Sequence, residues 1–157
     1  MAQTNTEVQT ALNNLVATHR VFTSKLYQHH FYVQGTHFFT LHEKFEELYN
    51  EATEHFDELA ERLLALGGKP YSTLQEFLDH SVIKEKPYTE KITDTDMVSS
   101  VVADFRIMRD ELSKAITLTG QSEDDVTQDI LIGYKTEIEK HIWMFQAFLG
   151  NNPLDGE

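Results

Sequence analysis

Apolar residues recur every three or four positions along four long stretches of this sequence, and this spacing is the strongest constraint on its fold. The stretches run from Val8 to Val33, from Phe38 to Leu66, from Met97 to Ile116 and from Ile130 to Leu149. Such a spacing places the apolar side chains on one face of an α-helix. The sequence therefore predicts an all-α protein with four long helices.

Glycines and polar residues indicate where these helices end and begin. Gly35 follows the first stretch, Gly67-Gly68 follows the second, and Gly120 follows the third. Ser122 and Asp125 form a Ser-x-x-Asp start signal before the fourth stretch. We therefore expect the last helix to open at Ser122.

The second and third helices are joined by a long connection, from about Gly67 to Thr93. Long structureless loops are uncommon in compact domains, so we expect a short extra helix from Thr73 to His80. Two helical hairpins joined by one long crossover form the ferritin-like four-helix bundle. We predict a single domain over residues 1–157, with flexible tails at 1–6 and 151–157.

Composition excludes several classes of protein. The net charge is −13, from 13 basic and 26 acidic residues, which argues against nucleic-acid binding through a positive surface. There is no cysteine and no long apolar run, which excludes disulfides and a membrane span. With no signal peptide in the polar N-terminus, we expect a cytoplasmic protein.

A strip of polar residues flanks the apolar face of the second helix. Taking His42 as zero and about 100° per residue, Glu46 lies near 40°, Asp57 near 60° and Glu61 near 100°. Imidazole and carboxylate are suitable ligands for iron. A solvated helix face rich in Glu and His would have the same composition, so that reading stays open.

One chain cannot use all four residues at one metal site. His42 and Glu61 are separated by about 28 Å along a helix, whereas metal–ligand bonds are about 2 Å long. Two antiparallel copies of the helix, related by a two-fold axis near Glu51 and Ala52, would remove the conflict. His42 and Glu46 of one copy would then face Glu61 and Asp57 of the other.

The first helix supplies a fifth candidate. A short turn at Gly35-Thr36 joins the first two helices, so they should form an antiparallel hairpin. In that hairpin His30 lies opposite His42. Both imidazoles could reach the same cluster.

These residues occur in a pattern that closely resembles the Dps family, and its ferritin-like members that do not bind DNA in particular. The family pattern is His-x11-His-x3-Asp/Glu-x10-Asp-x3-Glu, and His30, His42, Glu46, Asp57 and Glu61 match it without a gap. The segments 30–46, 57–68 and 124–145 carry the resemblance, which covers nearly the whole chain.

The resemblance implies a hollow homododecamer built from two-fold dimers, with ferroxidase centres between subunits. His30, His42 and Glu46 of one subunit, with Asp57 and Glu61 of its mate, would bind ferrous iron. Hydrogen peroxide would be the preferred oxidant, with oxygen as the alternative, and ferric mineral would be stored inside. Glu46 stands where Asp is more usual in the family, and Phe31 stands where many members have Trp.

Other residues have two interpretations. Three aspartates lie near the start of the fourth helix, at Asp124, Asp125 and Asp129. Their negative charges either interact favourably with the helix N-terminus or, as the resemblance implies, line a three-fold pore that attracts cations. Glu43 and Glu47 either form a solvated face or nucleate mineral. We assign Trp143, Phe145 and Phe148 to the core.

Three other functions compete with iron oxidation. A DNA-compacting Dps protein is disfavoured because the first basic residue is Arg20 and residues 151–157 contain none. A di-iron enzyme with its metals inside one bundle uses Glu-x-x-His motifs, and no histidine here has Glu three residues before it. A passive metal buffer is separated from a ferroxidase only by the resemblance.

Overall fold

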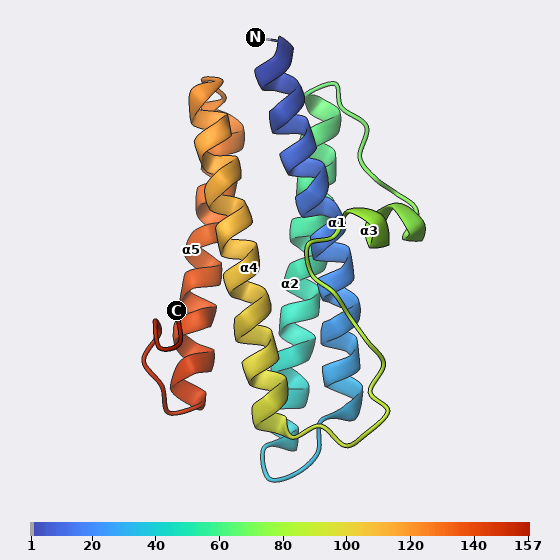
Figure 1. Cartoon of the computed structure of the whole chain (residues 1–157), viewed down its shortest axis with the longest axis vertical. Coiled ribbons are helices and arrows are strands. Elements are labelled where there is room, and N and C mark those ends of the chain that lie inside the picture. The colour runs from blue at the N-terminus through green and yellow to red at the C-terminus, as the bar shows by residue number, and fades with distance from the viewer. Residues whose placement is uncertain (1) are drawn as a thin grey trace.

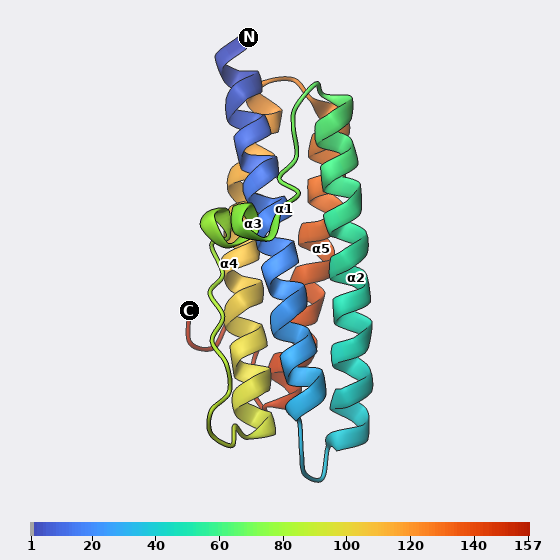
Figure 2. The same cartoon turned by 90° about the vertical axis from the view of Figure 1, so that its right-hand side faces the viewer.

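The computed structural model describes residues 2–157, with side chains from Asn5 onward, and this range folds into five α-helices without a strand. Four long helices run side by side, and a short one lies against α1 (Figures 1 and 2). The all-α prediction and the extra helix in the crossover are confirmed. The helices are α1 (Ala2–Tyr32), α2 (Phe38–Ala65), α3 (Leu74–His80), α4 (Asp94–Gln121) and α5 (Asp125–Phe148).

The directions of the helices follow from the lengths of their connections. The turn after α1 is short, so α2 runs antiparallel to it, and α5 likewise runs antiparallel to α4 (Figure 1). The crossover carries the chain back along the whole bundle, so α4 starts at the same end as α2 (Figure 1). This is the ferritin-like arrangement of two hairpins and one crossover.

The crossover is held against α1 by its own short helix. Thr73 caps α3, because its hydroxyl accepts from the Glu76 N–H at 3.3 Å and the Glu76 carboxylate accepts from the Thr73 N–H at 3.1 Å. Phe77 is buried and meets the Phe56 ring edge-on, with centroids 5.5 Å apart. Beyond α3, the Val82 N–H donates to the Thr18 hydroxyl at 3.1 Å. The long connection is therefore ordered.

The apolar faces predicted from the sequence meet in one core between the long helices. Its largest fully buried side chains come from α1, α2, α4 and the crossover, including Phe22 of α1, Phe45 of α2 and Met108 of α4, and α5 contributes the buried Leu131. None of the helices between residues 2 and 157 combines the length and apolar character that a membrane span requires.

The corner between α4 and α5 differs from the prediction. Ser122 ends α4, since its N–H donates to the Leu118 carbonyl, and Glu123 adopts a φ of 57° that stops the helix. Asp124 then caps α5 by accepting from the Thr127 N–H at 3.0 Å. The start signal read at Ser122 is therefore wrong, because the left-handed residue moves the cap two positions along.

The segments predicted to be flexible tails continue or contact the helical bundle where the structure describes them, and their flexibility stays a prediction. Residues 2–6 continue α1, since no glycine or proline interrupts it, while Met1 lies outside the described residues. Residues 151–157 turn back onto α4. Arg106 donates there to the carbonyls of Pro153 at 3.1 Å and Asp155 at 2.7 Å, and Arg109 pairs with Glu157.

The aromatic residues of α5 were only partly assigned correctly. Phe145 is buried as predicted, but Trp143 is 53% exposed and Phe148 is 37% exposed. Trp143 lies one position past the buried Ile142, hence about 100° around the helix and away from the core. These two rings leave an apolar surface on the subunit.

Candidate metal centre

His30, near the end of α1, and His42, near the start of α2, face each other beside the turn that joins these helices. Their rings are stacked, with centroids 3.7 Å apart and planes inclined by 13°. His42 also stacks on Phe38, at a centroid distance of 4.9 Å. The juxtaposition predicted from the hairpin is confirmed, and the ligand role of the two residues stays a prediction.

The backbone fixes the orientation of both imidazoles. The Nδ1 atom of His30 lies 2.7 Å from the carbonyl oxygen of His42, and the Nδ1 atom of His42 lies 2.8 Å from the carbonyl oxygen of His30. A carbonyl only accepts, so each Nδ1 carries the proton. The lone pair of a neutral ring is then on Nε2, and this is how metal-binding histidines are commonly held.

Glu46 follows His42 by one helical turn and is exposed. Its carboxylate accepts a hydrogen bond from the Tyr49 hydroxyl at 3.1 Å. The Tyr49 ring stacks on Tyr27 at 4.0 Å and meets His30 edge-on at 5.4 Å. Burial and the neighbouring Glu46 raise the pKa of Tyr49, so it stays a hydrogen-bond donor. Tyr49 thereby links the carboxylate to the histidine pair.

Asp57 and Glu61 lie farther along α2 and are both exposed. The 19 positions between His42 and Glu61 correspond to about 28 Å of helix. Within one chain, therefore, the structure brings His30, His42 and Glu46 together and leaves Asp57 and Glu61 apart from them. Each chain thus carries the predicted ligands in two separate groups, His30, His42 and Glu46 in one and Asp57 and Glu61 in the other.

The three aspartates near the start of α5 differ in their surroundings. The Asp124 carboxylate already has two structural partners: it caps the N-terminus of α5, and it lies 3.3 Å from Nη2 of Arg62. Although partial burial opposes ionisation, hydrogen bonds from Thr127 and Arg62 hold the pKa of Asp124 below its ordinary value. Asp125 and Asp129 are exposed. Of the three aspartates, Asp125 and Asp129 are the ones that neither cap a helix nor pair with Arg62.

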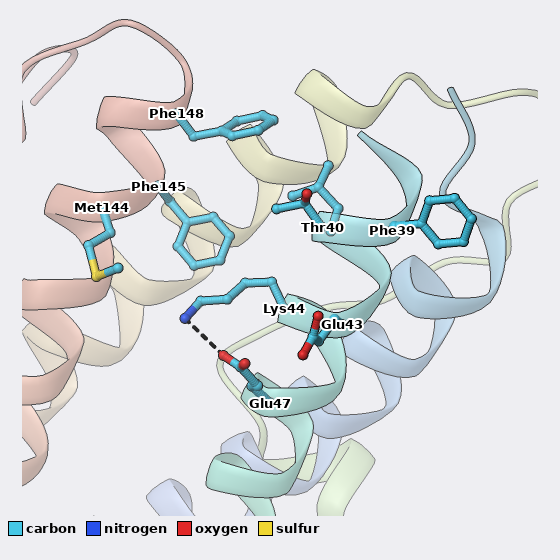
Figure 3. A pocket seen from close by; sticks show the side chains of 9 residues that line it. Phe39, Thr40, Glu43, Lys44, Glu47, Met144, Phe145 and Phe148 are labelled. Atoms are coloured by element: carbon cyan, nitrogen blue, oxygen red, sulfur yellow. Dashed lines mark hydrogen bonds and ion pairs between the residues drawn. The ribbon is translucent and has the colours of Figure 1, made fainter. Parts of the chain in front are cut away.

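Glu43 and Glu47 line a groove between α2 and α5 (Figure 3). Its floor and far side are apolar, with Phe145 and Phe148 opposite the acids (Figure 3). Lys44 pairs with Glu47 at 3.1 Å, so only Glu43 keeps an uncompensated carboxylate there. The groove therefore mixes apolar surface with one acidic edge.

Comparisons with known proteins agree over almost the whole chain. A family model described as a ferritin-like domain matches residues 9–154. The "DNA protection during starvation protein" of Listeria innocua is 51% identical over 144 residues, 92% of each chain. "DNA protection during starvation protein 2" of Bacillus anthracis is 48% identical over 145 residues, 92% of this chain and 98% of that protein.

Solved structures give the same result. The crystal structure of Dps from Listeria monocytogenes matches with a TM-score of 0.93 and 49% identity, over 94% of this chain and 96% of that one. This chain belongs to the Dps family. The matched range includes every residue of the Dps ligand pattern, from His30 to Glu61, so the family relationship extends over the candidate centre.

Sequence reasoning missed a second polar group, between α2 and α5 of this Dps bundle, which reaches from the buried His55 to the exposed Glu137. Glu51 and His55 of α2 face Glu137 and His141 of α5, and ligand atoms of Glu51, His55 and Glu137 lie within 4.8 Å of one another. The signal was present as two Glu-x-x-x-His pairs, which place both residues on one helix face. The search for Glu-x-x-His could not find them.

Proposed function

We propose that this protein oxidises ferrous iron at centres shared between two subunits and stores the ferric product inside a hollow homododecamer. His30, His42 and Glu46 of one subunit would bind iron together with Asp57 and Glu61 of the two-fold mate. The observation that carries this proposal is the histidine pair, whose Nδ1 protons are held by backbone carbonyls and whose Nε2 atoms are left for a metal.

The exposed surface around the pair supports a contact with another subunit. Tyr27, Phe31 and Tyr32 are large, exposed aromatic side chains on the same end of α1 as His30. Contiguous exposed apolar surface on a globular protein commonly marks an interface. A contact there would cover these rings and bring the second half-set of ligands to the first.

The chemistry of the ligands suits iron in both oxidation states. Neutral imidazoles favour the ferrous ion, while carboxylates favour the harder ferric ion. Ferrous ions supply electrons to hydrogen peroxide, which takes up protons and leaves as water. Consuming the two reagents together at a protein site prevents the formation of hydroxyl radicals in solution. Oxygen is the alternative oxidant.

Asp125 and Asp129 would attract ferrous ions to the interior, and Glu43 would seed mineral there. Their exposure and lack of competing partners support these roles better than those of Asp124 and Glu47, which are already paired. Replacing Asp125 and Asp129 together by Asn should slow iron uptake by the assembled protein without changing peroxide consumption in protein dissociated only as far as two-fold dimers, which keep the shared centres.

A mixing experiment tests the central proposal. Anaerobic protein loaded with ferrous iron receives peroxide or, separately, oxygen, and ferric absorbance is followed with time. Replacing His30 and His42 by Ala should slow the peroxide phase at least ~100-fold, since both imidazole ligands are lost. Replacing His80, an exposed histidine of α3, by Ala should change nothing. A passive metal buffer would show no catalysed phase in any of these proteins.

Protection of DNA, which the names of the relatives state for those proteins, would here come from removing iron and peroxide. The net charge of −13 and the absence of basic residues from 151–157 oppose direct DNA binding. A gel-shift assay at low salt should show no retained DNA.

A further inference from the structure

A cluster of histidines and glutamates joins α2 to α5 away from the candidate centre, with His55 buried and Glu137 exposed. His42 and His55 are 13 positions apart on α2, which corresponds to about 20 Å. The surrounding residues are core residues, among them Phe22, Phe105 and Met108. Charged groups seldom enter a core unless they are paired or bind a metal.

The antiparallel directions of α2 and α5 set up a reciprocal arrangement. His55 Nε2 lies 2.8 Å from a carboxylate oxygen of Glu137, and His141 Nε2 lies 2.6 Å from a carboxylate oxygen of Glu51. Tyr134 stacks on His55, with centroids 3.8 Å apart, and fixes the plane of that ring. Two carboxylates and one imidazole thus converge from opposite helices.

His19 of α1 adds an observation that ion pairing does not explain. Its side chain is 0% exposed, and its Nδ1 donates to the Leu15 carbonyl at 2.7 Å. Its Nε2 is buried and has no hydrogen-bond partner among the described residues. Nearly all buried polar atoms in proteins form a hydrogen bond, so the unpaired Nε2 atom of His19 is an exception that a bound ligand would explain.

His19 lies beside two members of the cluster. His19, Glu51 and His55 line the same cavity, of about 10 Å³, and the His19 and His55 rings meet edge-on at 5.8 Å. A volume of this size holds about one water-sized sphere.

We propose that Glu51, His55 and Glu137 bind one divalent transition-metal ion inside each subunit, with His141 orienting Glu51 and His19 lining the cavity beside the site. Imidazole and carboxylate groups are common ligands for zinc and ferrous ions. The two carboxylates balance the charge of a divalent ion, so the filled site carries no net charge. The site is separate from the one shared between subunits.

The test uses a protein in which the shared centre is disabled. The H30A/H42A variant is stripped of metal with a chelator, loaded with Co²⁺ or Zn²⁺ and desalted. We expect one retained ion per chain, visible d–d absorption typical of low-coordinate Co²⁺, and a higher Tm with Zn²⁺. No retained ion in this background would overturn the proposal, whatever the fate of the iron-oxidation proposal.

Further variants in the same background assign the ligands. His55→Gln should abolish retention, and Glu137→Gln, at a partly exposed position, should do so with no effect on folding. His19→Leu fills the cavity with apolar atoms, so it should leave the apo protein folded while changing the Co²⁺ spectrum. Glu54→Gln, an exposed residue of α2, is the matched control. Retention that survives both His55→Gln and Glu137→Gln would exclude the site.

Discussion

His30 and His42 exchange hydrogen bonds across the two arms of one hairpin, next to its turn, each Nδ1 donating to the other residue's carbonyl oxygen at 2.7 and 2.8 Å. These carbonyls belong to the last turn of α1 and the first turns of α2. The imidazoles are therefore oriented by backbone rather than by side chains that could rotate. A metal that binds at Nε2 meets a pair of ligands that is already arranged, which reduces the ordering cost of binding.

Complementation between two inactive variants tests whether the centre is shared. One variant is H30A/H42A and the other is D57N/E61Q. In a mixed two-fold dimer, one site has both half-sets of ligands and the other has neither. Random pairing in co-expressed protein makes about half of the dimers mixed, so about a quarter of the wild-type sites should be intact. The initial rate of ferric absorbance after peroxide addition measures this recovery.

A second pairing serves as its control. Co-expression of H30A/H42A with E46Q places both defects in the same half-set, so no mixed dimer contains an intact site. Activity should stay at the background of the separate variants. Equal recovery in the two mixtures, or none in either, would contradict a centre assembled from two subunits.

Tyr49 should act on metal affinity through Glu46. Tyr49→Phe keeps the ring that stacks on Tyr27 and removes the hydroxyl that donates to the carboxylate. Loss of a hydrogen bond to a metal ligand commonly weakens binding about 10- to 100-fold. Anaerobic calorimetry with ferrous iron should show at least a ~10-fold weaker Kd. Tyr71→Phe, in the crossover, is the control, and an unchanged Kd for Tyr49→Phe would remove Tyr49 from the centre.

The bundle was predictable from the sequence because periodicity and turn lengths determine it. The positions of Phe45 and Leu59 follow from the apolar stripe of α2, and both are fully buried. The meeting of His30 with His42 follows from the short turn between their helices. Apolar periodicity and turn length were therefore sufficient to predict contacts within a single helical hairpin.

Features that depend on three elements were not predictable in the same way. The convergence of His19 with His55 and Glu137 requires the relative rotation of α1, α2 and α5, which no pair of helices specifies. The ordered end of the chain depends on Arg106 and Arg109 of α4, which are remote in sequence. The cap of α5 was misplaced because a single residue with positive φ shifted it.

The buried ion pair between Lys25 and Asp104, at 2.7 Å, should be costly to break on one side only. Burial raises the pKa of Asp104 even though Lys25 opposes the shift. Lys25→Met leaves this carboxylate buried without a partner, which should cost about 3–5 kcal/mol at pH 7. The double variant K25M/D104L should recover most of that loss in urea unfolding at equal protein concentration.

The loss of unfolding free energy caused by Lys25→Met should depend on pH in a predictable direction. Because the folded-state pKa of Asp104 is raised above its unfolded value, the folded protein takes up a proton first as the pH falls. The penalty of Lys25→Met should therefore decrease toward acidic pH, and it should be greatest at neutral pH. A penalty that is the same at pH 7 and in acid would show that lost packing of the Lys25 stem, and not the uncompensated charge, is responsible.

Asp124 should contribute to stability as a helix cap more than as a charge. Asp124→Ala removes the acceptor for the Thr127 N–H and should cost about 1–2 kcal/mol. Asp124→Asn keeps a good capping group and loses only the pairing with Arg62, so it should cost no more than about 1 kcal/mol.

The stabilisation that comes from the charge of Asp124 should depend on pH. Since the folded-state pKa of Asp124 is lowered, its charge stabilises the protein above the ordinary pKa of 3.8, and this stabilisation is lost as the pH falls below that value. Urea unfolding should therefore show that the difference between wild type and Asp124→Asn disappears in strong acid, while the difference between Asp124→Asn and Asp124→Ala persists there. If Asp124→Asn were as unstable as Asp124→Ala at pH 7, the ion pair with Arg62 would be the dominant contribution.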